Sequence, residues 1–255
     1  MKKIIFALCL LGTIIGCTKQ PTMIGHRGSL LGVENTEEAF INGASHYGYQ
    51  GLECDVKTTK DGQCVCWHDN DLKRGGWDSV YIAENTLDSL LTLTLTQTRK
   101  DVTYTATICT VDRYLEICKE YNVFPVVELK WATGINNNDM SLFPSLYALI
   151  EKHGLVEEAV ILTSMRQSLE YIRTNYPQLQ CQYLRQTVKD EDIQWCHVWN
   201  ANISIQHANI NKDVVAKCDS LGVQVAAWTV NNDSIYDRLV DLSCDFVTTD
   251  YLEVK

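Results

Sequence analysis

The fold is decided by one short stretch, Phe124-Pro125-Val126-Val127-Glu128-Leu129-Lys130. Its apolar run predicts a buried strand, because strands covered on both faces are apolar almost throughout. A charged pair, Glu128 and Lys130, nonetheless ends the run. Enzymes built on a (β/α)8 barrel place their active sites at the carboxyl ends of the strands. The stretch therefore predicts an inner barrel strand that carries functional residues at its end.

Similar short runs, rich in β-branched and aromatic residues, alternate with amphipathic stretches of helical length, which is typical of repeated β-α units. The predicted strands are 22–27, 51–57, 124–130, 159–164, 180–185, 202–206, 224–229 and 246–249. The predicted helices are 36–47, 111–121, 142–153, 167–175, 190–198, 214–221 and 234–242. Eight strands indicate an α/β fold of the (β/α)8 TIM-barrel class. An open doubly wound sheet is the alternative, but no Gly-rich phosphate loop follows the first strand.

A small hairpin and loop insertion is expected after the second strand. Asp61-Gly62 lies between two strand-like runs, and Asp-Gly is the strongest short hairpin signal. With these two residues as the loop, Asp55 pairs with His68, so a carboxylate faces an imidazole. Residues 75–107 show few periodic signals. We expect them to form an excursion with one short helix near 87–91.

Several other polar residues have a structural interpretation. Asn35, followed by Glu38, is predicted to cap the helix 36–47, with the glutamate reaching back to the cap. The later Glu84-Asn85-Thr86 is interpreted as another helix cap. His207 ends a predicted strand and is expected to be structural.

The N-terminus predicts an exported lipoprotein. Met1-Lys2-Lys3 precedes an apolar run, residues 4–15, which is too short to cross a bilayer and is typical of a signal peptide. Gly16-Cys17 then resembles a bacterial lipobox, where cleavage before the cysteine leaves it as the lipid-bearing N-terminus. We expect removal of residues 1–16 and a membrane anchor at Cys17, with the protein facing the periplasm or the cell exterior. An ordinary secretory signal that contains a cysteine is the alternative.

Bulk composition narrows the remaining possibilities. Removing 16 of 255 residues leaves 239, which fits one TIM-barrel domain over 17–255. The net charge of -10 argues against a nucleic-acid partner, because phosphate backbones are bound by clustered Lys and Arg. Setting aside Cys9 and Cys17 leaves nine of the 11 cysteines, an odd number without Cys-x-x-Cys spacing. We expect most of them to be small buried hydrophobic residues.

Three carboxylates are predicted to converge at the barrel mouth. Glu53 and Asp55 lie two residues apart on one strand and so point to the same face, and Glu128 ends the strand quoted above. Desolvated carboxylates repel one another, and a hard divalent ion is the simplest neutraliser. Oxygen ligands favour Mg²⁺ or Ca²⁺ over zinc. The alternative is neutralisation by salt bridges to the neighbouring cations Lys130, Arg27 or Lys57.

Histidines and further cations join the carboxylates. His26 ends the first strand and His68 the return arm of the hairpin, and two imidazoles beside a metal suit proton transfer in both directions. Arg27 offers a planar fork for phosphate oxygens, and Lys130 a point charge for a pentacoordinate transition state. Trp228 also ends a predicted strand, and we expect its flat face either to contact substrate or to pack in the core. Together these groups indicate phosphoryl chemistry.

The order of the motifs carries a resemblance. They are His26-Arg27-Gly28, Glu34-Asn35-Thr36, Glu53-x-Asp55, Asp61-Gly62, His68-Asp69, Glu128-x-Lys130, Trp228-Thr229-Val230-Asn231 and Thr249-Asp250. This ordered set, from residue 26 to residue 250, resembles the glycerophosphodiester phosphodiesterases.

The resemblance implies hydrolysis of glycerophosphodiesters, such as glycerophosphocholine or glycerophosphoethanolamine, to sn-glycerol 3-phosphate and a free alcohol. It also implies a divalent metal ion, Mg²⁺ or Ca²⁺. By position, it assigns Glu53, Asp55 and Glu128 to the metal, His26 and His68 to general acid–base catalysis, and Arg27 and Lys130 to the phosphate. The sequence indicates no particular oligomeric state.

Two rival functions share the barrel. A metal-independent phospholipase of the phosphatidylinositol type tends to replace the metal carboxylates with basic groups, so the three acids argue against it. A lipid-anchored binding protein without catalysis is the other rival. The presence of both histidines and all three acids argues against that second function.

Overall fold

A closed parallel barrel forms the centre of the computed structural model, which describes residues 20–254. The predicted signal peptide and Cys17 lie outside the described residues. The barrel strands are β1 (Thr22–Gly25), β2 (Gly51–Thr58), β7 (Phe124–Leu129), β8 (Val160–Thr163), β9 (Gln180–Arg185), β10 (Asn202–Gln206), β11 (Val225–Trp228) and β12 (Phe246–Thr249). Neighbours in this order pair in parallel, and β1 pairs with both β12 and β2. The predicted (β/α)8 barrel is confirmed.

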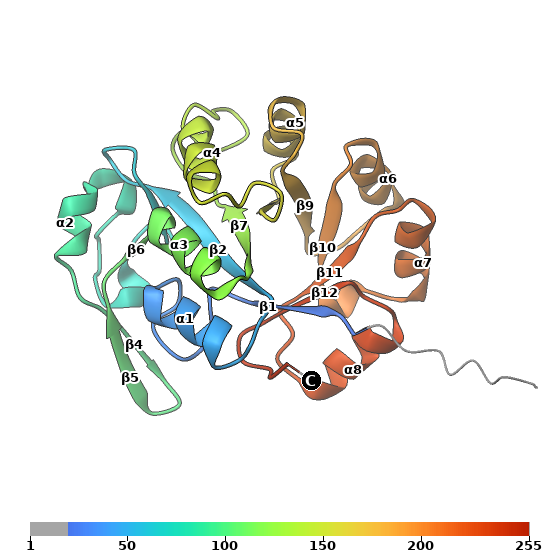
Figure 1. The fold of residues 1–255 in the computed structure, drawn as a ribbon, viewed down its shortest axis with the longest axis horizontal. Coiled ribbons are helices and arrows are strands. Elements are labelled where there is room, and N and C mark those ends of the chain that lie inside the picture. The colour runs from blue at the N-terminus through green and yellow to red at the C-terminus, as the bar shows by residue number, and fades with distance from the viewer. Residues whose placement is uncertain (1–19, 255) are drawn as a thin grey trace, which may run out of the picture.

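Helices surround the strands (Figure 1). They are α1 (Glu37–Ser45), α3 (Val111–Tyr121), α4 (Phe143–Lys152), α5 (Arg166–Asn175), α6 (Asp190–Val198), α7 (Lys212–Ser220) and α8 (Asp233–Asp241). All of them coincide with predicted helices to within two residues at their starts. Among the described residues, no helix has the length and apolar content needed to cross a membrane.

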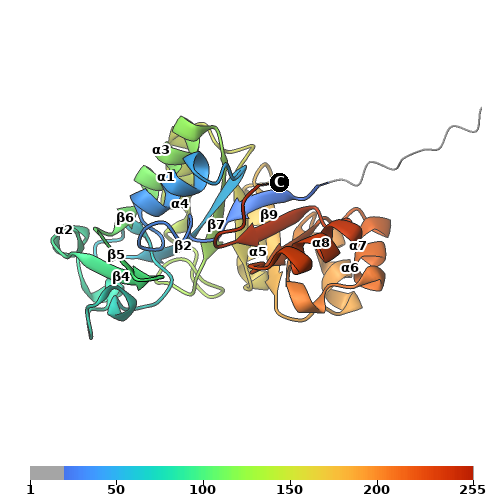
Figure 2. The same cartoon turned by 90° about the horizontal axis from the view of Figure 1, so that it is seen from below.

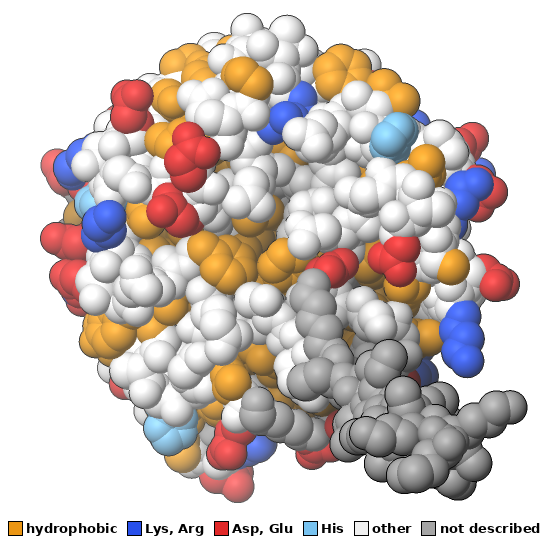
Figure 3. Space-filling view, turned by 45° about the vertical axis from the view of Figure 1, so that its right-hand side comes forward, with side chains coloured by type: hydrophobic (Ala, Val, Ile, Leu, Met, Phe, Trp, Pro, Cys, Tyr) orange, Lys and Arg blue, Asp and Glu red, His pale blue; other side chains and the backbone are white. Residues whose placement is uncertain are grey.

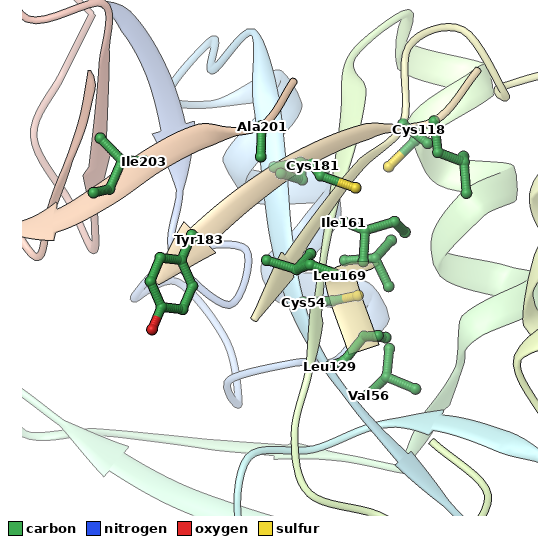
Figure 4. Close-up of a cluster of buried hydrophobic side chains, with 14 of the residues drawn as sticks. Cys54, Val56, Cys118, Leu129, Ile161, Leu169, Cys181, Tyr183, Ala201 and Ile203 are labelled. Carbon is green, nitrogen blue, oxygen red and sulfur yellow. The ribbon is translucent and has the colours of Figure 1, made fainter. Parts of the chain in front are cut away.

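Alternate residues of each barrel strand face the helices or the barrel interior. Cys54 and Val56 of β2 point outward into the main core, beside Leu129 of β7 and Ile161 of β8 (Figure 4). The intervening carboxylates of β2 therefore point inward. All nine described cysteines are buried with free thiols, which confirms their prediction as small buried residues.

The barrel interior has a small apolar cluster of its own. Ile24 of β1, Val126 of β7, and Val160 and Leu162 of β8 form it, all nearly inaccessible to solvent. Two residues after Ile24 and Val126 come the polar side chains of His26, directly after β1, and Glu128 of β7, which line the cavity above. The apolar cluster thus forms the floor below the predicted site.

An excursion between β2 and β7 stands to one side of the barrel (Figures 1 and 2). It comprises β3 (Cys64–Cys66), η1 (Lys73–Gly75), η2 (Ile82–Glu84), α2 (Leu87–Leu91), β4 (Leu95–Arg99), β5 (Val102–Ala106) and β6 (Cys109–Thr110). The short helix predicted near 87–91 is confirmed, and Thr86 caps it by accepting a hydrogen bond from the Ser89 N–H. The antiparallel pair β4–β5 was not predicted. No residue of β5 is fully buried, so its sequence lacks the alternation of apolar and polar residues that identifies a strand.

The predicted register of the hairpin after β2 is wrong by one residue. The loop has three residues, 60–62, because Gly62 adopts a left-handed conformation (φ 76°) that closes a three-residue loop. Trp67 therefore lies opposite Asp55, and its backbone N–H donates to the Asp55 carbonyl at 2.9 Å. His68 follows directly after this pair, where the chain leaves the sheet.

Candidate active site

A cavity of about 250 Å³ opens at the carboxyl ends of the barrel strands. Its lining comprises His26, Arg27, Glu53, His68, Glu128, Lys130, Leu162, Leu184, Ser204, Trp228, Thr229 and Thr248. The lining contains every residue that the sequence predicted for the site except Asp55, which is fully buried beside it. The barrel therefore brings the predicted residues together from strands far apart in sequence.

The three predicted metal ligands form a compact group. Asp55 and Glu128 are register partners on β2 and β7, and Glu53 precedes Asp55 on the same face of β2. One oxygen atom from each carboxylate lies within 4.8 Å of the other two. All three side chains are buried. This spacing suits a hard cation that takes carboxylate oxygens as ligands.

Two cations reach these carboxylates, but they do not satisfy all of them. Lys130 Nζ lies 2.6 Å from Glu128 Oε1 and 3.1 Å from Asp55 Oδ1, and Arg27 Nε lies 3.2 Å from Asp55 Oδ2. Glu53 Oε1 is buried without a hydrogen-bond partner among the described residues. The alternative of neutralisation by salt bridges therefore accounts for two of the acids and leaves the third. An additional cation fits the remaining oxygen.

Burial and crowding separate the pKa values of the acids. Burial, reinforced by the charge of Asp55, raises the pKa of Glu53 to about 8. Burial also opposes ionisation of Asp55, but the charges of Lys130 and Arg27 outweigh it and hold the pKa of Asp55 below its ordinary value. Without a further cation, Glu53 thus retains a proton at neutral pH, whereas a bound divalent ion favours its ionised form.

Each histidine at the mouth is oriented by a carboxylate. His26 Nδ1 lies 2.7 Å from Asp250 Oδ1, and His68 Nδ1 lies 2.6 Å from Asp69 Oδ1. With Nδ1 engaged in this way, Nε2 is the nitrogen that each ring has available for proton transfer. The sequence motifs contained both aspartates, but their role as partners of the histidines was not predicted.

The two histidines differ in their electrostatic surroundings. Burial lowers the pKa of His26, but the hydrogen bond with Asp250 and the charge of Glu53 outweigh it, so the net shift is upward. Burial also lowers the pKa of His68, and the charges of Lys130 and Arg27 oppose the favourable effect of Asp55, so the net shift is downward. One imidazole is therefore biased towards the protonated form and the other towards the neutral form.

Asn35 does not cap helix α1, contrary to the prediction. Thr36 occupies the cap position and makes no side-chain capping bond, so the reciprocal bond predicted for Glu38 does not form either. Asn35 is in the left-handed region (φ 58°), which asparagine tolerates better than most residues. Its side chain donates to Asp55 Oδ2 at 2.8 Å and accepts from the Asp55 N–H at 3.0 Å. Asn35 thus fixes the orientation of Asp55.

The backbone after β1 is similarly fixed to the site. Arg27 is left-handed (φ 53°), and its N–H donates to Glu53 Oε2 at 2.8 Å. Gly28 follows with φ 87°, and a Cβ there would lie 2.6 Å from the Ala39 carbonyl carbon. The close approach of α1 therefore requires glycine at this position and helps to aim the Arg27 N–H at the carboxylate.

Buried Glu34 connects the excursion to the site. Its carboxylate lies 3.0 Å from Arg27 Nη1, 3.4 Å from Arg74 Nε and 3.2 Å from Arg99 Nη2. Arg74 also pairs with Asp69, the partner of His68, at 3.0 Å. These contacts join residues distant in the chain, and no local pattern in the sequence indicated them.

The remaining predicted residues lie where the strands end. Trp228 closes β11 and lines the cavity, and its Nε1 has no hydrogen-bond partner among the described residues. His207 follows β10 but lies outside the cavity lining, and its carbonyl accepts from Arg238 Nη2 at 2.8 Å. His207 is therefore a structural residue, as expected.

Comparisons with known proteins agree with this geometry. Residues 25–254 match the model of the Glycerophosphoryl diester phosphodiesterase family. A glycerophosphodiester phosphodiesterase of Caldanaerobacter subterraneus subsp. tengcongensis is 25% identical over 240 residues, which cover 89% of this chain and 93% of that protein. One from Bacillus altitudinis is 24% identical over 226 residues, covering 86% and 89% respectively. An Oleispira antarctica phosphodiesterase, solved in complex with the product sn-glycerol-3-phosphate, matches with a TM-score of 0.78 at 22% identity over 91% of this chain and 94% of that chain.

Proposed function

The chain belongs to the glycerophosphoryl diester phosphodiesterase family and is a phosphodiesterase, and from this premise we propose that it hydrolyses glycerophosphodiesters to sn-glycerol 3-phosphate and an alcohol with a divalent metal ion. The observation that carries the proposal is the cluster of three buried carboxylates, in which Glu53 Oε1 has no partner among the described residues. The cluster faces the same cavity as two histidines, each held by an aspartate.

Glu53, Asp55 and Glu128 would hold the ion, and their all-oxygen character favours Mg²⁺ or Ca²⁺. When bound, the ion supplies positive charge that polarises phosphoryl oxygens. Asn35 keeps Asp55 in place for this role through its two hydrogen bonds. Partners that orient a ligand side chain in this way tune a metal site.

Arg27 and Lys130 bind the phosphoryl group in this proposal. Both line the cavity and both contact Asp55. Their preformed positions place positive charge where negative charge accumulates on the phosphoryl oxygens in the transition state. Because the cavity is small and partly apolar, water screens these charges less than it would at an open surface.

His26 and His68 transfer the protons. One imidazole takes a proton from the water that forms the new P–O bond, and the other gives a proton to the alcohol oxygen whose P–O bond breaks. The opposite pKa shifts of the two rings favour one protonated and one neutral histidine at the start of the reaction. Asp250 and Asp69 keep Nε2 of each ring directed away from its carboxylate partner.

A direct assay tests the proposal. The form of the protein that begins at Thr18 is incubated with glycerophosphocholine and glycerophosphoinositol, and release of sn-glycerol 3-phosphate is measured with EDTA and after Mg²⁺ or Ca²⁺ is restored. We expect EDTA to abolish activity, metal to rescue it and His26→Ala to remove it. Activity indifferent to EDTA would favour the metal-independent phospholipase, and no turnover by folded protein would favour the binding protein.

We also propose that residues 1–16 are an export signal, that Cys17 carries the lipid anchor, and that 17–255 is one exported domain facing the periplasm or the cell exterior. The support is the lipobox-like sequence before Cys17. Metabolic labelling with radioactive palmitate should mark the wild type and leave Cys17→Ala unlabelled. Equal labelling of both would reject the anchor.

The proposed partner is a small molecule and not a nucleic acid. On the face seen in Figure 3, Lys and Arg side chains are scattered singly among acidic, apolar and uncharged groups. Nucleic-acid sites instead gather basic side chains into a patch or stripe. The net charge of -10 points in the same direction.

A further inference from the structure

A second cavity, of about 430 Å³, lies beside the barrel mouth. It is bounded by η2 of the excursion on one side and by the loop after β7 on the other, and the side chains that matter are Lys57, Thr58, Asn70, Tyr81, Trp131 and Thr133. We infer that this cavity, named here the side cavity, binds the leaving alcohol of the substrate and that this alcohol is a polyol. The inference rests on the proposed function.

The lining of the side cavity adjoins the catalytic groups along three chain segments. Lys57 follows Asp55 by two residues on β2, and residues two apart share a face of a strand. Asn70 follows His68 by two residues, and Trp131 follows Lys130 directly. Three parts of the lining are thus extensions of segments that carry a proposed catalytic or phosphate-binding residue. In this inference, a diester whose phosphate lies on Lys130 extends one of its two alcohol groups into the side cavity.

The two cavities differ in what they can hold. The barrel cavity, of about 250 Å³, is lined by Glu53, Glu128 and the two histidines, so the glycerol phosphate portion common to all these substrates must enter it. The side cavity, of about 430 Å³, lacks these groups. It therefore suits the variable portion of the substrate, which is the alcohol on the other side of the phosphorus.

Lys57 sets the chemical character of the side cavity. Its side chain is only 6% exposed, and Nζ lies 2.7 Å from Asn70 Oδ1 and 3.4 Å from the Trp131 carbonyl oxygen. An ammonium group has three donors, so one remains for a ligand oxygen. A buried positive charge repels a quaternary ammonium or amino alcohol, whereas it attracts a hydroxyl oxygen. Lys57 thus selects against choline and ethanolamine.

Acidic side chains at the rim do not reverse this preference. Glu84 and Asp139 also line the side cavity, but both are exposed to solvent. Exposed charges are screened by water and salt and contribute little to binding. The buried charge of Lys57 is screened much less, and its effect on a bound alcohol dominates.

Two exposed aromatic rings complete the side cavity. Trp131 is 58% exposed and Tyr81 is 43% exposed, which is unusual for rings that bury large apolar areas when they can. A flat aromatic face packs well against the C–H face of a cyclic polyol. Thr58 and Thr133 also line the side cavity. The Thr58 hydroxyl already donates to the Thr133 carbonyl at 2.8 Å, so towards a polyol it can only accept. A cyclitol such as inositol matches this combination of rings, hydroxyl groups and one buried cation.

The test compares three substrates that share glycerol phosphate and differ in the leaving alcohol: glycerophosphoinositol, glycerophosphocholine and the methyl ester of sn-glycerol 3-phosphate. The measured quantity is kcat/KM for the metal-loaded protein that begins at Thr18. We expect the wild type to prefer glycerophosphoinositol over glycerophosphocholine by roughly tenfold or more, because unpaired polar groups in a site strongly reject an unsuitable partner.

Variants then locate the origin of the preference. In Trp131→Ala and Lys57→Met, the ratio of kcat/KM on glycerophosphoinositol to that on the methyl ester should fall about tenfold, since the methyl group does not reach the side cavity. Trp131 is exposed, so its variant keeps the test valid if Lys57→Met fails to fold. Tyr121→Ala is the matched control, because Tyr121 is an exposed aromatic on α3 that lines neither cavity.

Several outcomes would overturn the inference. An unchanged ratio in Trp131→Ala would mean that the side cavity does not hold the leaving alcohol. A wild-type preference for glycerophosphocholine that Trp131→Ala removes would assign the cavity to a cation instead of a polyol. Turnover of the methyl ester without a preference for glycerophosphoinositol would reject the polyol and leave the proposed function intact. No turnover of any of the three would reject the proposed function itself.

Discussion

The two halves of the barrel mouth differ sharply in charge. The strands β1, β2 and β7, with the residues directly after them, carry the ionisable groups His26, Arg27, Glu53, Asp55, Glu128 and Lys130. The strands β8 to β12 contribute the uncharged side chains Leu162, Leu184, Ser204, Trp228 and Thr248 to the same cavity. Three adjacent strands and the excursion thus supply the proposed reacting groups. The rest of the ring lines the cavity with uncharged side chains and, directly after β12, supplies Asp250, the partner of His26.

The excursion leaves the barrel between β2 and β7, which places it on the charged half. From there it returns His68 to the mouth and brings Arg74 and Arg99 to Glu34. The uncharged half has no comparable insertion among the described residues. The proposed catalytic residues and most of the contacts that support them therefore lie in the charged half. Substitutions in the charged half should mainly affect kcat, and substitutions in the uncharged half should mainly affect KM.

The largest effect is expected for Asp55→Asn on the charged half. This change keeps the side-chain shape but removes the charge that faces Lys130, Arg27 and the proposed ion. We expect kcat to fall on the order of 10³-fold, because preorganised charge is usually the main source of transition-state stabilisation. Steady-state kinetics with the variant checks this, with circular dichroism as the control for folding. A fall of less than tenfold would refute the central place of Asp55.

A second effect concerns stability of the metal-free protein. Because the pKa of Glu53 is raised from 4.5 to about 8, the folded state binds more protons than the unfolded state between these pH values. The free energy of unfolding should therefore fall as pH rises from about 5 to 8, by about 1–4 kcal/mol. Urea unfolding in EDTA across this range measures the change.

Glu53→Gln is the matched control for that pH dependence. The variant cannot ionise at this position, so its free energy of unfolding should change less over the same pH range. Added Mg²⁺ or Ca²⁺ should also remove most of the fall in the wild type, because the ion lets Glu53 ionise. Identical pH profiles for wild type and variant would assign the titration to another group.

A smaller effect is expected for Asn35→Gly. Glycine keeps the left-handed backbone at φ 58° and removes only the two hydrogen bonds to Asp55. We expect kcat to fall about 10–100-fold, the usual result of removing a group that orients a metal ligand. Asn35→Ala should lose a further ~1–2 kcal/mol of stability, because alanine is strained at this φ. Wild-type kcat in the glycine variant would show that Asp55 needs no such support.

The smallest effect is expected on the uncharged half. Trp228→Phe retains an aromatic face at the end of β11 but reduces its area. We expect KM to rise about 2–5-fold with little change in kcat, since apolar contacts of this kind bind substrate and transition state alike. A loss of kcat as large as that of Asp55→Asn would remove the distinction between the two halves.

Much of the fold followed from periodicity. All eight barrel strands and the seven helices around them were predicted, because apolar runs bounded by polar residues identify buried parallel strands. The site followed from the same rule. Once the strands were placed, residues two apart such as Glu53 and Asp55 had to share the inward face, and closure of the barrel brought them near Glu128.

The sequence-based predictions failed where a local motif allows two structures, and they missed contacts between residues far apart in the chain. Asn followed three residues later by Glu is a genuine capping pattern, yet tertiary packing holds Asn35 against Asp55 instead. Asp-Gly allows both two-residue and three-residue loops, and the choice shifted the register by one residue. The salt bridges of Glu34 with Arg74 and Arg99 connect segments far apart in the chain, and no spacing rule indicates such pairs.

The central claim is that the charged half holds a divalent cation on its three carboxylates, and isothermal titration of Mg²⁺ and Ca²⁺ into the metal-free protein tests it most directly. Titrations at pH 7 should show one ion bound per chain. Because the pKa of Glu53 is raised to about 8, binding should release a proton from this residue. Repeating the titration in buffers of different ionisation enthalpy measures that proton release. Asp55→Asn should lose this binding. Absence of binding at millimolar metal, or undiminished binding in the variant, would contradict the account.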